Sequence, residues 1–372
     1  MKYYIIAGEA SGDLHASRLI REIRNNDPAA VFRVWGGDLM EQAGGRLVKH
    51  YRDLAFMGFL EVATHLKTIL RNLNFCKKDI LEFKPDLLIL VDYPGFNLRM
   101  AKFASRQGFR VVYYISPQVW AWKKSRVYSI RKYVDKMLVI LPFEKAFYSK
   151  YQIDVDFVGH PLMDILHEIK DTGSGEDFLK RNTLPDMPVI ALLPGSRKQE
   201  IKRILPVMIR TVEAFPEYQC VIAGAPSLDR EYYRAVTGEK DVRILFGQTH
   251  DLLRHSQAAL VASGTATLEA ALIGTPQVVC YRGSAISYAI ARRLVDVKYI
   301  SLVNLIMDRP VVTELIQDDL TAEKLKRALE KILQGPERDA MTSDYRSLRE
   351  QLGGPGAAAR AAEIIHQLLK RG

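Results

Sequence analysis

The hydrophobic pattern of the chain repeats one unit many times: a short apolar run, a turn rich in small residues, and a segment with helical spacing. The run from Leu87 to Val91 contains no polar residue, which is typical of a parallel strand covered on both faces. The N-terminal half therefore favours a doubly wound parallel α/β sheet. Its predicted strands are 3–7, 31–34, 87–91, 111–115, 136–141 and 155–158.

A second alternating series opens after a polar, strand-poor stretch at 164–186. A chain of 372 residues is expected to form two domains, because single cores stop growing at about 250–300 residues. We predict a Rossmann-like domain at 1–165 and a second one at 166–349. A C-terminal helix within 350–372 could pack against the first domain, although the sequence does not require this. The second series predicts strands at 188–193, 218–223, 242–245, 259–262 and 277–281.

The segment 56–75 has helical spacing that allows two interpretations. A core helix with a broad apolar face has this pattern, and so has an interfacial helix that inserts into lipid headgroups. The pattern leaves both open. The apolar stripe consists of Phe59, Val62, Leu66, Ile69 and Leu73, with Met57, Leu60 and Leu70 beside it and Lys67 and Arg71 at its border.

Composition is that of a soluble globular protein, with 48% hydrophobic and 26% charged residues. Cys76, Cys220 and Cys280 lie far apart and form no CxxC pair, which argues against a disulfide framework and a zinc site. The first residues enter a strand without a signal-peptide pattern, and no apolar run approaches the ~20 residues that span a bilayer. We therefore expect a cytoplasmic protein, which is still able to sit on a membrane surface.

The net charge of +10 is concentrated in one region, because residues 101–150 carry 11 Lys or Arg against 2 acids, a net charge of +9. Such a field favours nucleic acid, an anionic membrane or a phosphorylated substrate. No nucleic-acid module accompanies the basic residues, so a nucleic-acid partner is not expected. A solvated helical face and a non-enzymatic basic protein are the alternatives.

The stretch from Ser263 to Glu269 predicts a phosphate site. An apolar run feeds a helix through Ser263, Gly264 and Thr265, so free backbone N–H groups and the positive end of the helix dipole face a ligand. Glu269 follows one turn later, where a carboxylate can reach the ribose diol of a nucleotide. The alternative is an ordinary strand-to-helix turn with a solvated glutamate.

A second turn of this kind follows the predicted strand 188–193. Gly195 and Ser196 offer backbone donors, and Arg197 can clamp a phosphate with its planar fork. The chain contains neither GxGxxG nor GxxxxGK[ST], so the dinucleotide and P-loop fingerprints are not supported.

Further candidate site residues lie in the N-terminal half. Asp92 directly follows the strand 87–91, where ligands of open α/β sheets collect, and could act as a general base on a sugar hydroxyl. A helix cap is the alternative. Ser11 and Gly12 lie in the turn after the first strand. Trp120 and Lys123 lie in an aromatic and basic segment that could clamp a sugar and its phosphate or anchor at a membrane interface.

Seven motifs in one order resemble the bacterial lipid-A-disaccharide synthases of glycosyltransferase family 19, over nearly the full length. Individually these motifs are weak, but together they are specific. They are Gly8-Glu9-Ala10-Ser11-Gly12-Asp13, Val91-Asp92-Tyr93-Pro94-Gly95-Phe96-Asn97, Ser116-Pro117-Gln118-Val119-Trp120-Ala121-Trp122, Gly159-His160-Pro161, Leu193-Pro194-Gly195-Ser196-Arg197, Ser263-Gly264-Thr265-Ala266-Thr267-Leu268-Glu269 and Asn304-Leu305-Ile306.

The resemblance implies a GT-B fold, in which two Rossmann-like domains face each other across a cleft, and an inverting transferase without metal or other cofactor. The donor would be UDP-2,3-diacylglucosamine and the acceptor 2,3-diacylglucosamine 1-phosphate (lipid X). The β-1,6-linked lipid A disaccharide 1-phosphate and UDP would form at the anionic inner face of the bacterial inner membrane. The oligomeric state stays open, with a homodimer as one option.

The resemblance also assigns residues. It implies that Asp92 is an essential acid and Arg197 an essential basic side chain. Val303 stands where the resemblance leads us to expect proline, which puts the geometry of that loop in doubt. A UDP-N-acetylglucosamine 2-epimerase on a similar scaffold is the alternative enzyme. The positions that match a nucleotide pocket are Ser196, Ser263, Gly264, Thr265, Glu269 and Asn304.

Overall fold

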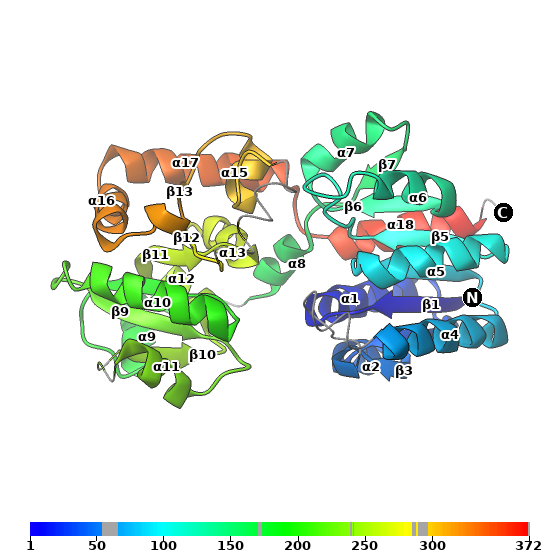
Figure 1. Ribbon diagram of the computed structural model, residues 1–372, viewed down its shortest axis with the longest axis horizontal. Coiled ribbons are helices and arrows are strands. Elements are labelled where there is room, and N and C mark those ends of the chain that lie inside the picture. The colour runs from blue at the N-terminus through cyan, green and yellow to red at the C-terminus, as the bar shows by residue number, and fades with distance from the viewer. Residues whose placement is uncertain are drawn as a thin grey trace. The chain divides into compact units, whose positions relative to one another are not determined.

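The computed structural model describes residues 1–53, 66–169, 173–238, 240, 242–284, 288 and 297–370. The chain divides into two compact units (Figure 1). The N-terminal unit comprises Met1–Asp164 and Leu352–Gly372, and the C-terminal unit comprises Ile165–Gln351. Each unit is a parallel sheet with interleaved helices, which confirms the predicted α/β class.

The N-terminal unit has a seven-stranded sheet in the order β3-β2-β1-β4-β5-β6-β7. All of its neighbouring strands are parallel. The chain winds outward from β1 in one direction and from β4 in the other, so the order reverses between these two strands. The strands are β1 (Lys2–Ala7), β2 (Val31–Gly36), β3 (Arg46–His50), β4 (Leu87–Val91), β5 (Arg110–Tyr114), β6 (Lys136–Val139) and β7 (Val155–Phe157).

Helices cover both faces of this sheet, because successive strand residues enter opposite cores. Tyr3 and Ile5 join one buried cluster, while Tyr4 and Ile6 join the other. The helices are α1 (Ala10–Asn26), α2 (Asp38–Gln42), α4 (Leu66–Phe83), α5 (Pro94–Arg106), α6 (Arg126–Tyr133), α7 (Pro142–Ser149), α8 (Pro161–Glu168, which continues into the C-terminal unit) and α18 (Ala357–Lys370), with a 3-10 turn η1 (Tyr51–Asp53).

The last helix, α18, belongs to the N-terminal unit and packs against α1. The buried carboxylate of Asp164 accepts backbone N–H groups of Gly356, Ala357 and Ala358 at the start of α18. The Arg360 guanidinium donates to the Val158 carbonyl oxygen at 2.8 Å. These contacts tie the C-terminal segment to the end of the first chain segment, although the two are far apart in sequence.

The C-terminal unit has a six-stranded parallel sheet in the order β10-β9-β8-β11-β12-β13, which reverses between β8 and β11. The strands are β8 (Val189–Leu193), β9 (Gln219–Gly224), β10 (Arg243–Phe246), β11 (Ser256–Ala262), β12 (Gln277–Tyr281) and β13 (Thr313–Ile316). The helices are α9 (Gly175–Arg181), α10 (Lys198–Val212), α11 (Arg230–Thr237), α12 (Thr249–Arg254), α13 (Thr265–Ile273), α15 (Leu302–Met307), α16 (Ala322–Leu333) and α17 (Pro336–Gln351), with a 3-10 turn η2 (Gln317–Asp319).

The segment 56–75 is described from Leu66 onward as the start of α4, and its earlier residues lie outside the described part. Leu73 is buried in the core and Ile69 packs against it. Leu70 is 50% exposed and Phe75 is 46% exposed. The described part therefore shows both a core face and an apolar outer face. Among the described helices, none has the length and hydropathy to cross a bilayer.

Candidate active site

The N-terminal unit has one position where a ligand site is expected from topology alone. In doubly wound sheets, ligands bind at the carboxyl ends of the strands where the strand order reverses. Here that point lies between β1 and β4. Gly8 and Glu9 follow β1, and Asp92 directly follows β4. The fold thus brings the first two predicted motifs together.

Asp92 is held in an unusual backbone conformation. Asp92 and Tyr93 are consecutive non-glycine residues with φ of 44° and 49°, and such residues cluster at functional sites. The Tyr113 hydroxyl donates to the Asp92 carbonyl oxygen at 2.5 Å, and the Asn97 amide donates to the same oxygen at 2.8 Å. Gly8 is required beside them, because a Cβ there would lie 2.3 Å from the Tyr93 ring.

The Asp92 carboxyl group has a raised pKa of about 6. Burial is the largest cause, since the charged form loses hydration. The negative charge of Glu9 raises the pKa further, while the backbone N–H of Tyr93 stabilises the carboxylate and lowers it. A carboxylate with a pKa close to neutrality is well matched to accepting a proton from a substrate hydroxyl. Glu9 was not among the residues selected from the sequence.

The influence of Glu9 is testable with the variant Glu9→Gln. Removing its charge is expected to lower the pKa of Asp92, so that the acid limb of the pH profile of kcat/KM moves to lower pH. Glu82→Gln, at an exposed position of α4, serves as the matched control and should leave the limb in place. An unshifted limb in Glu9→Gln would show that the titrating group does not sense Glu9.

The other residues after β1 have divided roles. Helix α1 begins at Ala10, so Ser11 and Gly12 lie in its first turn. Ser11 is exposed, whereas Gly12 is buried and a Cβ there would lie 3.1 Å from the Cβ of Ala7. The buried Asp13 carboxylate accepts three backbone N–H groups around the start of α2, at 2.7, 3.1 and 3.2 Å. Ser11 is thus open to a ligand, while Asp13 holds the fold.

The two tryptophans of the aromatic segment differ in exposure. Trp120 is only 9% exposed and meets the Phe143 ring edge-on with centroids 5.0 Å apart. Trp122 is 36% exposed, with the Lys123 ammonium 4.6 Å and the Arg126 guanidinium 5.1 Å from its ring centroid. The structure therefore places Lys123 at the surface and presents Trp122, not Trp120, for contact.

Buried polar side chains hold the start of this aromatic segment in place. The Glu144 carboxylate is 1% exposed and accepts the backbone N–H groups of Leu141 and Ile140 at 2.9 and 3.2 Å. Burial raises its pKa to about 7, against the stabilising effect of these hydrogen bonds. The Ser116 and Tyr148 hydroxyls are hydrogen bonded at 2.6 Å beside it. The first residue of the aromatic segment, Ser116, is thus held by a hydrogen bond to a buried side chain.

In the C-terminal unit the strand order reverses between β8 and β11, and both predicted phosphate turns follow these two strands. Gly195 has φ of 106°, and a Cβ there would lie 2.8 Å from the Glu200 carboxylate and 3.6 Å from the Cβ of Ala262. Ser196 and Arg197 are exposed just before α10, with the Arg197 guanidinium 3.6 Å from Glu200. Glycine is favoured here because the backbone is left-handed.

The neighbouring turn leads into α13. Gly264 and Thr265 are exposed at its start, where backbone N–H groups lack helical acceptors. The Ser263 hydroxyl donates to the Ile300 carbonyl oxygen at 3.1 Å, and the Thr267 hydroxyl donates to the Gly264 carbonyl oxygen at 2.8 Å. Ser263 therefore links this turn to the loop before α15, while Gly264 and Thr265 are open to a ligand.

Glu269 has a partner that sequence reasoning missed. Its carboxylate lies 2.9 Å from the His250 Nε2 atom, and the two side chains are 22% and 27% exposed. His250 is the second residue of α12, which follows β10. The imidazole holds the carboxylate in place without covering it, so Glu269 can still accept hydrogen bonds from a diol.

The ribose role assigned to Glu269 gives a second test. Glu269→Ala is expected to weaken UDP binding by about 10- to 100-fold, because a carboxylate contributes strong hydrogen bonds to a diol. His250→Ala should weaken it less, since the imidazole acts through Glu269. Isothermal titration calorimetry measures both, with Glu217→Ala, at an exposed position of the same unit, as the control. Unchanged UDP affinity in Glu269→Ala would remove the ribose role.

The Asn304 side chain makes hydrogen bonds within the fold. It is 1% exposed, and its amide nitrogen donates at 2.9 Å to both the Val312 carbonyl oxygen and the Glu314 carboxylate. Its amide oxygen accepts the backbone N–H groups of Val311 and Val312 at 2.8 and 2.9 Å. The side chain fixes the start of α15, whose preceding loop contacts Ser263. Asn304 thus lies near the 263–265 turn as a buried support of the loop that contacts Ser263.

The two points at which the strand order reverses, here called switch points, carry side chains suited to different chemistry. The N-terminal one presents a carboxylate with a pKa of about 6, which suits proton transfer. The C-terminal one presents two helix starts and Arg197, which suit a diphosphate. Within the described residues, no group of three or more His, Cys, Asp and Glu side chains is placed to hold a metal ion.

Two doubly wound α/β units of this kind define the GT-B fold class. A UDP-GlcNAc 2-epimerase from Neisseria meningitidis, solved with UDP-GlcNAc bound, matches with a TM-score of 0.60 over 100% of both chains at 14% identity. The calicheamicin glycosyltransferase CalG4 matches with a TM-score of 0.65 at 18% identity, covering 99% of this chain and 98% of that one. At these identities the likeness concerns the fold alone.

Sequence relatives resolve the class further. The chain belongs to the lipid-A-disaccharide synthetase family, whose model matches residues 3–368. A lipid-A-disaccharide synthase of Syntrophus aciditrophicus is 43% identical over 376 residues, covering 99% of this chain and 97% of the relative. The chain is thus a glycosyltransferase of lipid A disaccharide synthesis, which confirms the resemblance drawn from the seven motifs.

Proposed function

We propose that this enzyme transfers 2,3-diacylglucosamine from UDP-2,3-diacylglucosamine to lipid X, with inversion at the anomeric carbon. The products are the β-1,6-linked lipid A disaccharide 1-phosphate and UDP. The observation that carries the proposal is the Asp92 carboxylate, which lies at a ligand-binding switch point with a pKa of about 6. Family membership supports this choice of substrates.

In this mechanism Asp92 accepts the proton of the acceptor 6-hydroxyl. The oxygen forms a bond to the anomeric carbon of the donor as the bond from that carbon to the UDP oxygen breaks. Because attack comes from the face opposite UDP, the α-linked donor gives a β-linked product. Burial, together with the negative charge of Glu9, raises the pKa of Asp92 to about 6, which suits proton transfer near neutral pH.

The donor is held by the C-terminal unit in this proposal. Arg197 and the exposed N–H groups at the start of α13 bind the diphosphate, and Glu269 binds the ribose. As UDP leaves, negative charge grows on the diphosphate. Oriented N–H groups and a guanidinium fork stabilise that charge most strongly in the transition state. We therefore propose a transfer that needs neither a metal ion nor another cofactor.

The acceptor and the membrane are assigned to the N-terminal unit. Trp122, Lys123 and Arg126 present an aromatic ring flanked by cations, which suits a sugar phosphate at a lipid headgroup layer. Leu70 and Phe75 on α4 expose apolar surface that a lipid layer could cover. We propose peripheral association with the inner face of the bacterial inner membrane.

The direct test incubates the purified protein with UDP-2,3-diacylglucosamine and lipid X in detergent, followed by mass spectrometry of the lipid product. A disaccharide 1-phosphate with a β linkage by NMR spectroscopy is expected. Incubation with UDP-N-acetylglucosamine alone distinguishes the epimerase, because only an epimerase converts that substrate without an acceptor. Conversion in that reaction, with no disaccharide in the first, would overturn the proposal.

A further inference from the structure

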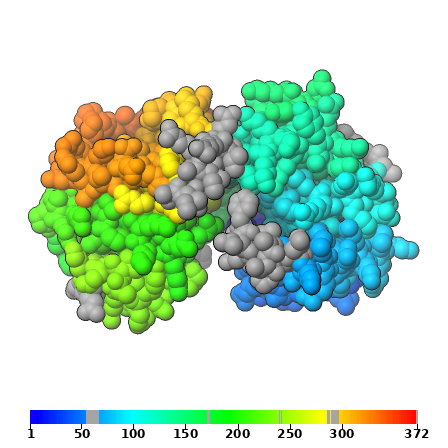
Figure 2. Space-filling view, viewed as in Figure 1, coloured from blue at the N-terminus to red at the C-terminus, as the bar shows by residue number. Residues whose placement is uncertain are grey.

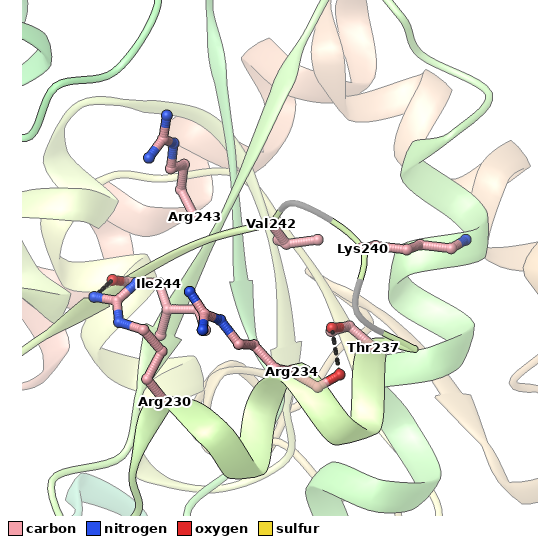
Figure 3. A pocket seen from close by; sticks show the side chains of 7 residues that line it. All are labelled: Arg230, Arg234, Thr237, Lys240, Val242, Arg243 and Ile244. Carbon is pink, nitrogen blue, oxygen red and sulfur yellow. Dashed lines mark hydrogen bonds between the residues drawn. The ribbon is translucent and has the colours of Figure 1, made fainter.

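A surface pocket of about 450 Å³ lies in the C-terminal unit, between α11 and the start of β10 (Figure 3). Helix α11, yellow-green in Figure 2, lies at the surface of the unit. Arg243 is the first residue of β10, and Figure 3 shows it directed away from Arg230 and Arg234. The pocket thus offers these side chains no shared ligand position. A better-defined arrangement surrounds the backbone of Asp92 in the N-terminal unit.

The carbonyl oxygen of Asp92 lies between a strand and a helix and is bound by neither backbone. The Asp92 N–H donates to the Tyr114 carbonyl oxygen at 3.2 Å, which continues the pairing of β4 with β5. The Asn97 N–H, in the first turn of α5, donates at 3.0 Å to the carbonyl oxygen of Tyr93 and not to that of Asp92. Within the described part of the chain, the Asp92 carbonyl oxygen accepts hydrogen bonds only from the side chains of Tyr113 and Asn97.

Tyr113 is well placed to hold this oxygen. It is 0% exposed, and its strand β5 is paired on both sides, with Leu90 of β4 and Met137 of β6 as its neighbours. The fold therefore fixes the backbone from which the hydroxyl reaches Asp92 at 2.5 Å. Burial raises the pKa of Tyr113 well above its usual value, so the hydroxyl keeps its proton and remains a donor.

The next residue, Tyr114, shows that burial alone does not explain this contact. Tyr114 is also 0% exposed, but its side chain lies in the core on the opposite face of the sheet. Its hydroxyl has no hydrogen-bond partner among the residues that the structure describes. Two adjacent buried tyrosines of one strand thus differ in one respect, since only the Tyr113 hydroxyl contacts the Asp92 turn.

We propose that Tyr113 is a positioning residue for the transfer reaction. Its hydroxyl holds Asp92 and Tyr93 in the left-handed conformation that directs the Asp92 carboxylate toward the acceptor hydroxyl. Left-handed backbone is unfavourable for residues with a Cβ atom and persists where surrounding contacts enforce it. A displacement of about 1 Å at a reacting group can cost about 10²-fold in rate. The role of Tyr113 rests on the proposed function, because it requires Asp92 to be the base.

The first test is Tyr113→Phe, which keeps the buried ring and removes only the hydroxyl. We expect kcat to fall by about tenfold or more, while UDP affinity and the KM for the acceptor stay close to the wild-type values. Tyr114→Phe is the matched control and should keep the wild-type kcat, because it removes a hydroxyl without a described partner. Melting temperatures are measured for both variants. If Tyr113 were merely structural, its variant would melt earlier but the folded enzyme would keep the wild-type kcat.

The second test repeats Tyr113→Phe in the Asp92→Asn background. The additional loss of rate should be much smaller there than in the wild type, because the base that Tyr113 positions is already absent. The same fold-loss in both backgrounds would overturn the positioning role. So would wild-type turnover in Tyr113→Phe when Asp92→Asn is impaired, and that result would leave the proposed function standing. Near wild-type turnover in Asp92→Asn itself would instead refute the proposed base, and the role of Tyr113 with it.

Discussion

Asp92→Asn is expected to lower kcat by about 10²- to 10⁴-fold, the usual contribution of a positioned general base. Asparagine keeps the shape of the side chain but cannot accept a proton at working pH. The backbone contacts from Tyr113 and Asn97 go to the Asp92 carbonyl oxygen, so the substitution leaves them in place. UDP binding should survive, because the residues assigned to it lie in the other unit.

Steady-state kinetics with both substrates and calorimetry with UDP measure the two halves of this prediction. Asp154→Asn, at a position whose side chain is 87% exposed in the same unit, is the matched control and should keep full activity. Near wild-type turnover in Asp92→Asn would rule out its role as the base.

The raised pKa of Asp92 adds a pH signature with a definite sign. Only the ionised form accepts a proton, so kcat/KM of the wild type should fall as the pH drops through about 6. Asp92→Asn should lose this limb along with the rate. If Asp92 had a purely structural role, the acid limb of the kcat/KM profile would keep its position in Asp92→Asn.

The central strands of both sheets could be predicted because they are buried on both faces and so read as unbroken apolar runs. Of the four edge strands in the described sheets, β7 and β10 were predicted at 155–158 and 242–245, whereas β3 and β13 were not. β3 (Arg46–His50) and β13 (Thr313–Ile316) each pair with a neighbour on one side only in the described sheets, and both contain charged residues. Their sequences do not differ from those of surface loops, so only tertiary pairing identifies them.

Some candidate site residues could likewise be located from the local sequence pattern, whereas others are identified only by tertiary contacts. The positions of Asp92, Arg197 and the 263–265 turn could be predicted, although not their roles, because each lies in the turn after a recognisable strand, and strand ends meet at one edge of a parallel sheet. Glu9 and His250 could not be selected, since their roles depend on contacts with residues 83 and 19 positions away. Similarly, the sequence does not tell which of Trp120 and Trp122 is buried.

Asn304 shows a further limit of motif reasoning. The motif marks the residue, but its spacing cannot tell ligand contact from support. In the structure all four hydrogen bonds of the Asn304 amide are made with Val311, Val312 and Glu314. The Glu314 carboxylate also accepts from the Ser301 N–H at 2.9 Å, so one buried network sets the loop that meets Ser263. This network therefore fixes the position of the loop to which the Ser263 hydroxyl donates.

Arg197→Ala is expected to lower kcat by about 10²- to 10³-fold, similar to the loss of a donor that stabilises charge in a transition state. The effect should fall on kcat more than on the KM for the donor, because the charge on UDP grows as the glycosidic bond breaks. The Arg197 side chain is 67% exposed, so the fold should tolerate the change. Arg197→Lys keeps the charge but loses the planar fork, and should recover only part of the rate.

Single-turnover kinetics with both variants separate chemistry from product release. Arg210→Ala, at an exposed position in the last turn of the same helix α10, removes an equal charge and should leave kcat unchanged. Such a result would place the effect at the start of the helix, beside the 263–265 turn, where the diphosphate is proposed to bind. If Arg197→Ala instead raised the KM of the donor with kcat unchanged, the guanidinium would bind the donor equally in ground and transition states, and the departing charge would be met by the N–H groups at the start of α13 alone.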